Sequence, residues 1–303
     1  MAKHLVQLAL LIMLATQSIP AQQSKPAVSE VPFSFKKGFV IVEAKIKGNV
    51  PVNVILATGT ENSVTDPSFL KKYDLSAGYA GEGPVTGRND KTYYFAIVKD
   101  VSVGATKSSA MRMRFGSLSD VSNAVGQEIF ATLGADFFRD QAVQFDFKNK
   151  VIRFFDKTPP ELVDNKNPSF NAAKTTVLQM APKPSNPFQA TILVPVVKDV
   201  LLNGQKVNLL MDTGVATSIA LSSSTAKKVA LALPDENGPP REGKVTLRLE
   251  SYELTDLPIW IFAKGTSADQ KLSQYGAVAG SAFLQNFVVT FDYKKSVVVL
   301  ERF

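Results

Sequence analysis

The most constraining feature of this sequence is an internal repeat of two stretches that share one pattern. Residues 207–219 read VNLLMDTGVATSI, and residues 52–64 read VNVILATGTENSV. In both stretches an apolar strand runs into a tight turn containing Thr-Gly, and Val, Asn, Thr, Gly and Ser occupy matching places. Ala57 stands where Asp212 stands. The repeat predicts two similar halves, of which only the second carries an acid at its turn.

A second pair of matching passages closes each half. Residues 133–138 read LGADFF and lead to FDFK at 145–148, while residues 279–284 read AGSAFL and lead to FDYK at 291–294. These two ordered motifs resemble those of the aspartic peptidases, the retropepsin and pepsin group. In that family two similar lobes each contribute one Asp-Thr/Ser-Gly turn to a shared site.

The resemblance implies an all-β fold with a few short helices, in which two acid-protease-like β-barrel lobes are related by the repeat and enclose a cleft. The expected first lobe covers residues 30–156 and the second covers residues 189–303. Residues 157–188 are rich in proline and are predicted to be a linker that adds one strand near residues 175–180. The length of 303 residues also suits two domains rather than one.

The N-terminus has the layout of a secretory signal peptide. Lys3 and His4 precede an apolar run over residues 5–15, and Pro20 lies just before a small residue. The run is too short to span a bilayer, which takes roughly 20 residues. We therefore expect residues 1–21 to be removed and the protein to be exported to the periplasm or the medium, without a membrane anchor.

The composition excludes several kinds of chemistry. The chain has no Cys, and its one His lies in the predicted signal peptide. A mature chain of this kind cannot form a Ser-His-Asp or Cys-His arrangement or the usual zinc sites, so carboxylate chemistry remains. We expect no metal and no cofactor. The net charge of +7 comes from scattered basic residues, which does not favour nucleic-acid binding.

Local patterns predict the elements around the two turns. Residues 39–46 alternate as a strand with one buried face, and residues 52–56 form the strand that enters the first turn. Asp66 and Pro67 are typical of an N-cap and a first helical position, so a short helix is expected there. Residues 222–233 show helical spacing just beyond the second turn.

A glycine-rich segment at residues 78–87 precedes an alternating stretch at residues 92–103. Gly tolerates positive φ angles, which suits a mobile hairpin tip. The family resemblance implies that this position is a flap that closes over substrate, with Gly81, Gly83 and Gly87 as candidate substrate-binding residues. The alternative is an ordinary surface loop.

The turn chemistry implied by the resemblance is incomplete. Aspartic peptidases use two carboxyl groups that share one proton and hold a water between them. With Ala57 opposite it, Asp212 is expected to lack a like charge that would raise its pKa and to be a plain carboxylate at neutral pH. The candidate site consists of Asp212 as a base, Thr213 and Gly214 as its loop support, and the degenerate partner loop Ala57, Thr58 and Gly59.

Three functions remain open at this stage. The first is a monomeric binding module that takes an extended peptide or unfolded protein as an added strand without cutting it. The second is an active endopeptidase in which Asp212 meets Asp212 of a second chain in a homodimer. The third is a noncatalytic exported β scaffold, because a fold does not determine a function.

Overall fold

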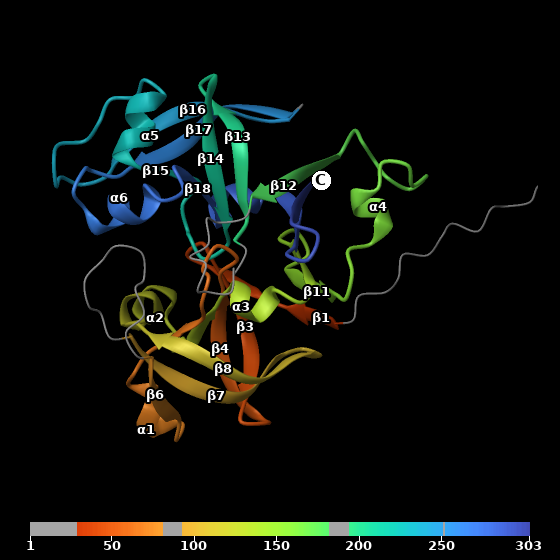
Figure 1. Ribbon diagram of the computed structural model, residues 1–303, viewed down its shortest axis with the longest axis vertical. Coiled ribbons are helices and arrows are strands. Elements are labelled where there is room, and N and C mark those ends of the chain that lie inside the picture. Colours follow the sequence, from red (N-terminus) through yellow and green to blue (C-terminus); the bar gives the residue numbers. More distant parts are fainter. Residues whose placement is uncertain (1–28, 81–92, 182–193, 251) are drawn as a thin grey trace, which may run out of the picture.

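The chain folds into two β lobes that share one sheet (Figure 1). The computed structural model describes residues 29–80, 93–181, 194–250 and 252–303. Strands dominate both lobes, and the helices among the described residues are all short, the longest being α2 with 7 residues. The predicted all-β, two-lobed class is confirmed.

The first lobe begins with strands and contains three short helices. Its elements are β1 (Ser29–Pro32), β2 (Ser34–Lys36), β3 (Phe39–Ile46), β4 (Val50–Leu56), β5 (Val64–Thr65), α1 (Phe69–Lys72), β6 (Ser76–Ala80), β7 (Tyr93–Val103), β8 (Thr106–Phe115), α2 (Ser119–Val125), β9 (Ala131–Leu133), α3 (Ala135–Phe138), β10 (Ala142–Asp146) and β11 (Val151–Phe155).

The connecting segment and the second lobe follow. Their elements are α4 (Pro160–Val163), β12 (Thr175–Ala181), β13 (Val196–Leu202), β14 (Gln205–Asp212), β15 (Ile219–Leu221), α5 (Ser223–Lys228), β16 (Arg241–Leu249), β17 (Tyr252–Ile261), α6 (Ser267–Leu272), β18 (Ala277–Gly280), α7 (Ser281–Leu284), β19 (Phe287–Asp292) and β20 (Val297–Arg302). The predicted strand in the linker is β12.

Each lobe closes into a six-stranded barrel by the same sequence of pairings. In the first lobe the order is β3-β4-β9-β5-β8-β7, and the pairing of Lys45 with Ser102 joins β7 back to β3. In the second lobe the order is β13-β14-β18-β15-β17-β16, and the pairing of Leu201 with Arg248 joins β16 back to β13. The sequence repeat is therefore a repeat of whole barrels.

The two turns of the repeat are held by equivalent strands. In the first lobe β4 runs parallel to β9, with Leu56 opposite Leu133, and in the second lobe β14 runs parallel to β18, with Asp212 opposite Gly280. The strand after each turn, β5 or β15, then pairs antiparallel with the same neighbour. Each turn thus emerges at the end of a barrel strand whose position is fixed on both sides.

A shared sheet joins the lobes, with its strands in the order β1-β11-β10-β19-β20-β12, and it continues into the second barrel where β12 pairs with β13. At its centre β10 of the first lobe pairs antiparallel with β19 of the second, with Val143 opposite Phe291 and Phe145 opposite Val289. Phe145 and Phe291 are fully buried and pack edge to face, with their ring centroids 5.8 Å apart. A continuous hydrophobic core therefore runs from one barrel into the other.

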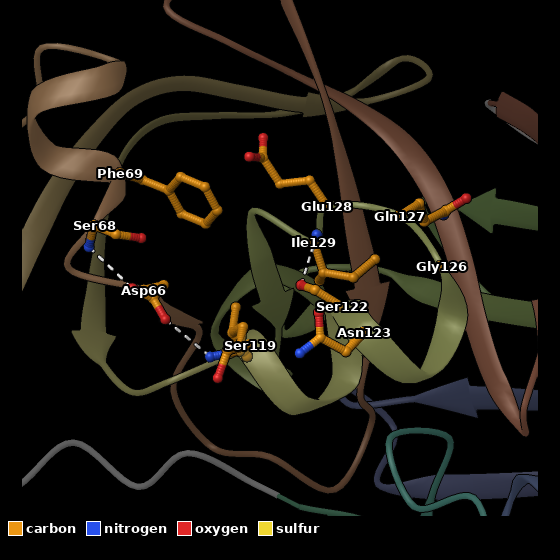
Figure 2. Close-up of a pocket in the computed structure, with 11 residues that line it drawn as sticks. Asp66, Ser68, Phe69, Ser119, Ser122, Asn123, Gly126, Gln127, Glu128 and Ile129 are labelled. Atoms are coloured by element: carbon orange, nitrogen blue, oxygen red, sulfur yellow. Dashed lines mark hydrogen bonds between the residues drawn. The ribbon is translucent and has the colours of Figure 1, made fainter.

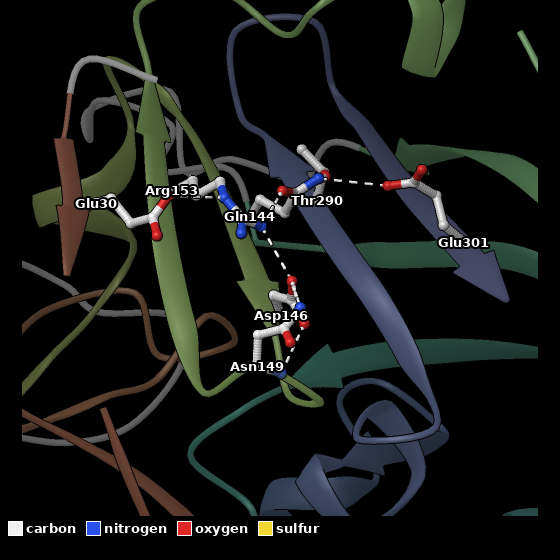
Figure 3. Close-up of polar contacts among 7 residues, drawn as sticks. All are labelled: Glu30, Gln144, Asp146, Asn149, Arg153, Thr290 and Glu301. Carbon is white, nitrogen blue, oxygen red and sulfur yellow. Dashed lines mark hydrogen bonds and ion pairs between the residues drawn. The ribbon is translucent and has the colours of Figure 1, made fainter. Parts of the chain in front are cut away.

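The other face of this shared sheet carries a polar network (Figure 3). The Arg153 guanidinium donates to Gln144 and Asp146, both at 3.1 Å, and to Glu30 at 3.1 Å. The Gln144 amide in turn donates to Thr290 Oγ1 at 3.1 Å and to Glu301 Oε2 at 3.3 Å. The network therefore crosses the boundary between the lobes.

Two helix predictions need correction at their ends. The first helix, α1, begins at Phe69 rather than at Pro67, although the Asp66 carboxylate accepts the N–H of Ser68 as an N-cap residue does. The N–H groups of Phe69 and Leu70 bond to the carbonyls of Asp66 and Pro67, so the chain enters the helix through a tighter turn. The second, α5, begins at Ser223 after Ser222, whose side chain accepts the Thr225 N–H, but it ends at Lys228 instead of reaching residue 233. Ala230 has a φ of +59°, which stops the helix.

Some sequence predictions lie outside the described residues. These are the signal peptide at 1–21 and the glycines Gly81, Gly83 and Gly87 of the proposed flap. The strands on either side, β6 and β7, pair as a hairpin. Among the residues that the structure describes, we find no helix with both the length and the apolar character needed to traverse a bilayer.

Candidate active site

The two Thr-Gly turns meet at the boundary between the lobes. Asp212 Oδ1 accepts the N–H of Gly214 at 2.8 Å and, from the other lobe, the N–H of Gly59 at 3.0 Å. A Cβ added to Gly214 would lie 2.5 Å from the Cβ of Ala57 and 3.1 Å from Asp212 Oδ1. Ala57 and Asp212 therefore belong to one site, with a methyl group on one side and a carboxyl group on the other.

Glycine is required at both turns because the two loops approach each other so closely. A Cβ at Gly59 would lie 2.6 Å from the Cβ of Asp212, which is closer than two carbon atoms can pack. Without side chains, the two N–H groups reach the carboxylate directly. The glycines of both loops therefore donate to one acid, Asp212.

The two threonines lock the loops together by reciprocal hydrogen bonds. Thr58 Oγ1 donates to the Met211 carbonyl at 3.0 Å and accepts the Thr213 N–H at 3.1 Å. Thr213 Oγ1 donates to the Leu56 carbonyl at 2.7 Å and accepts the Thr58 N–H at 3.2 Å. Both threonines are fully buried, so each hydroxyl satisfies backbone groups that water cannot reach.

The electrostatics of Asp212 follow from its burial. Only 6% of this residue is exposed. Burial raises the pKa of its carboxyl above the ordinary value, while the N–H groups of Gly214 and Gly59 act in the opposite direction. The sequence predicts only that no neighbouring acid raises this pKa, whereas in the structure removal of the carboxyl from water is the larger influence.

Two other acids of the first lobe, Asp66 and Asp146, have hydrogen-bond partners of their own. The Asp66 carboxylate accepts the N–H groups of Ser68 and Leu118, and Asp146 contacts Asn149 and Arg153. Neither of them fills the place opposite Asp212. Among the described residues, no group of three or more acids, His or Cys is arranged to hold a metal ion.

Asp136 supports the degenerate turn in a way that the sequence analysis missed. Its carboxylate accepts the N–H of Ser63 at 2.9 Å and the Ser63 hydroxyl at 2.7 Å, and that hydroxyl also accepts the Gly134 N–H at 3.0 Å. Burial raises the pKa of Asp136, although the bonds from Ser63 oppose the rise. Aligning the two closing passages places Ala282 at this position in the second lobe, which was the available signal.

Tyr293 is a second residue that the sequence did not single out. It belongs to the second lobe, yet its hydroxyl donates to the carbonyl of Thr58 in the first, at 2.9 Å. Its ring stacks on Phe138 with a centroid distance of 6.2 Å. Burial, and then the charge of Asp212, raise the pKa of Tyr293 well above its ordinary value, so it is a neutral donor that anchors the turn.

A third contact between the lobes involves Ser281 at the start of α7. Its hydroxyl lies against the carbonyls of Gly38 and, at 3.1 Å, Val215. Gly38 has a φ of +83°, and a Cβ there would lie 2.6 Å from the Cβ of Ala216. The loop before β3 can therefore approach the Asp212 turn only because it carries glycine.

Comparisons with known proteins add no relative. No protein-family model matches the chain, and no curated protein matches its sequence. The assignment of a function therefore depends on the geometry of the site.

Proposed function

We propose that this protein is an exported relative of the aspartic peptidases that binds an extended polypeptide between its lobes without cutting it. The observation that supports this most directly is the pairing of Ala57 with Asp212 across the lobe boundary. Two Thr-Gly turns face each other as a hydrolytic pair would require. One of them has the methyl group of Ala57 at the position where the other has the carboxyl group of Asp212.

The chemistry of one acid argues against efficient cleavage. Hydrolysis of an amide by this class needs one carboxylate to take a proton from water and one carboxylic acid to donate a proton to the carbonyl oxygen. A single carboxyl cannot be base and acid at once. Loss of general acid help commonly costs about 10² to 10⁴ in rate.

The reciprocal threonine bonds also disfavour a homodimeric peptidase. Bringing Asp212 of one chain against Asp212 of another would require the two lobes of each chain to separate. That separation breaks the bonds that Thr58 and Thr213 make across the boundary and leaves buried backbone groups unpaired. A monomer keeps all of them.

Digestion of unfolded casein from acidic to neutral pH tests the proposal. The mature wild-type protein is expected to leave casein intact, in the same way as the matched variant Asp212→Asn. Cleavage by the wild type that is lost in Asp212→Asn would contradict the noncatalytic function.

Restoring the missing acid provides the complementary test. Ala57→Asp is expected to place a second carboxyl beside Asp212, to raise the apparent pKa of the pair, and to give casein cleavage in acid at least about 10²-fold above the wild type. NMR titration of the carboxyl carbons measures the pKa change. An unchanged titration would show that residue 57 does not meet Asp212 in solution.

Binding itself can be measured with a random peptide library. A chain that binds extended polypeptide is expected to enrich peptides that form backbone hydrogen bonds as an added strand. Failure to enrich any peptide would favour a structural scaffold instead. Export is tested separately, by sequencing the N-terminus of the mature protein recovered outside the cytoplasm.

A further inference from the structure

The first lobe has a pocket of its own, separate from the Asp212 site (Figure 2). It has a volume of about 530 Å³ and is open to solvent. This volume lies within the range of about 300 to 1,000 Å³ typical of small-molecule sites. Its lining comes from α1, α2 and the segments that flank them, so the second lobe does not contribute to it.

The apolar part of the pocket is small. Phe69, Leu118 and Ile129 are buried side chains that line it, and Figure 2 shows the Phe69 ring directed toward the space between Asp66 and Glu128. These side chains are only 7%, 8% and 0% exposed, and the Phe69 ring packs on Tyr73 and Phe130, so they form a small floor beneath the polar groups. They do not provide the continuous apolar walls that a lipid or a large aromatic ligand needs.

The two acids of the pocket already have partners. The two Asp66 oxygens accept the N–H of Ser68 at 2.9 Å and the N–H of Leu118 at 3.0 Å. Glu128 contacts the Lys72 ammonium at 2.6 Å and the Tyr73 hydroxyl at 3.1 Å. The Lys72 ammonium balances the charge of Glu128, so Asp66 is the acid of the lining that disfavours an anion, and both of its oxygens already accept an N–H group.

The remaining polar groups are neutral and have capacity to spare. No hydrogen bond to the Asn123 amide occurs within the part of the chain that the structure describes. Ser122 accepts the Ile129 N–H at 3.1 Å, which leaves its hydroxyl proton available, and Gln127 accepts from Lys36 at 2.8 Å, which leaves its NH₂ group available. The pocket therefore offers amide and hydroxyl groups around a small apolar floor.

We infer that this pocket binds a neutral, hydroxyl-rich ligand, such as one or two units of a saccharide. A sugar ring has hydroxyl edges that pair with amides and hydroxyls. Uncharged hydroxyls also avoid the repulsion between the Asp66 carboxylate and an anion. The inference does not depend on whether the Asp212 site cuts or binds polypeptide.

The test is an NMR titration of the full mature chain with neutral monosaccharides and disaccharides. At least one sugar is expected to give saturable shifts confined to the amides of the pocket lining. Asn123→Ala is expected to weaken that binding about 5-fold, the loss of one net hydrogen bond. Because Asn123 is exposed on α2 and Ala favours helix, this variant should fold normally.

The matched control is Gln285→Ala, which removes an exposed amide at the end of α7 in the other lobe and should leave sugar affinity unchanged. Acetate and tetramethylammonium serve as charged probes and are expected to cause no saturable shifts at the pocket. The inference is overturned if no sugar gives a saturable response, if Asn123→Ala binds as tightly as the wild type, or if a charged probe saturates the same amides.

Discussion

The two turns of this protein share one backbone arrangement but differ in the group that a hydrolase would use. Thr58 and Thr213 make equivalent bonds to the opposite loop, whereas Ala57 and Asp212 differ completely in chemistry. The threonine bonds involve hydroxyl and backbone groups only. The comparison shows that the hydrogen bonds between the two loops do not need an acid at position 57, because they involve the threonines and the backbone alone.

A second difference between the halves has the opposite direction, because here the first lobe has the acid and the second lobe has the alanine. The first lobe has Asp136 bound to Ser63, while the second lobe has Ala282 at the matching position. The half that lacks an acid at its turn thus has a buried acid behind the turn. Gly59 belongs to the turn that has Ala57 in place of an acid, and it donates to Asp212 of the other turn. The single acid therefore receives N–H groups from both loops.

The largest effect on stability is expected from breaking the reciprocal hydrogen bonds of Thr58 and Thr213. Thr58→Val keeps the shape of the side chain but leaves the Met211 carbonyl and the Thr213 N–H buried without partners. A loss of about 3 kcal/mol in the free energy of unfolding is expected, and about the same for Thr213→Val. Urea denaturation measures both, with the exposed Thr255→Val on β17 as control.

If the reciprocal hydrogen bonds work as one unit, the double variant should lose less than the sum of the two single losses. Strictly additive losses would mean that the two threonines act independently.

Asp136→Ala tests whether the first turn needs the buried acid that the second lobe, with Ala282 at the matching position, does without. It removes the acceptor for the Ser63 N–H and hydroxyl, so a loss of about 2 kcal/mol in unfolding free energy is expected. The same measurement on Ser63→Ala and on the double variant gives the coupling between the two residues. Stability equal to the wild type in Asp136→Ala would show that the first turn needs no more support than the second.

Tyr293→Phe tests a contact that only one half supplies. The matching residue in the first lobe is Phe147, which packs on Phe33 and Phe35 and has no hydroxyl. Removing the Tyr293 hydroxyl keeps the ring on Phe138 but frees the Thr58 carbonyl, which is expected to cost about 1 kcal/mol. Thermal and urea unfolding check this, and an unchanged stability would show that the bond contributes nothing net.

The smallest effect on stability is expected from changing Glu301, which belongs to the polar network that crosses the lobe boundary. Burial, then the charges of Asp146 and Glu161, raise the pKa of Glu301 above its ordinary value of 4.5, while Arg153 opposes the rise. A raised pKa in the folded state means that the wild type loses stability as pH rises from 4.5 through the folded value.

Glu301→Gln does not titrate and should avoid that loss. Because Glu301 is partly exposed, the gain relative to the wild type at neutral pH is expected to be no more than about 0.5 kcal/mol. Unfolding free energies measured in acid and at neutral pH give the difference. A variant that loses stability relative to the wild type as pH rises would contradict the expected sign.

The sequence by itself determined the repeat, the strands that enter both turns, and the substitution of Ala57 for an acid. These are local patterns: alternation shows a strand, and aligned turns show which residue is missing. The helix ends were predicted less well. A tight turn over Asp66 to Leu70 precedes α1, and the positive φ of Ala230 shortened α5.

Only the tertiary structure decided which residues of the two halves touch. Thr58 and Thr213 are 155 positions apart in the chain, and Tyr293 is 235 positions from Thr58. Their contacts depend on the register of β10 against β19 and on the close approach that glycine allows at both turns. A local pattern carries no information about such a register, because many pairings would bury the same apolar residues equally well.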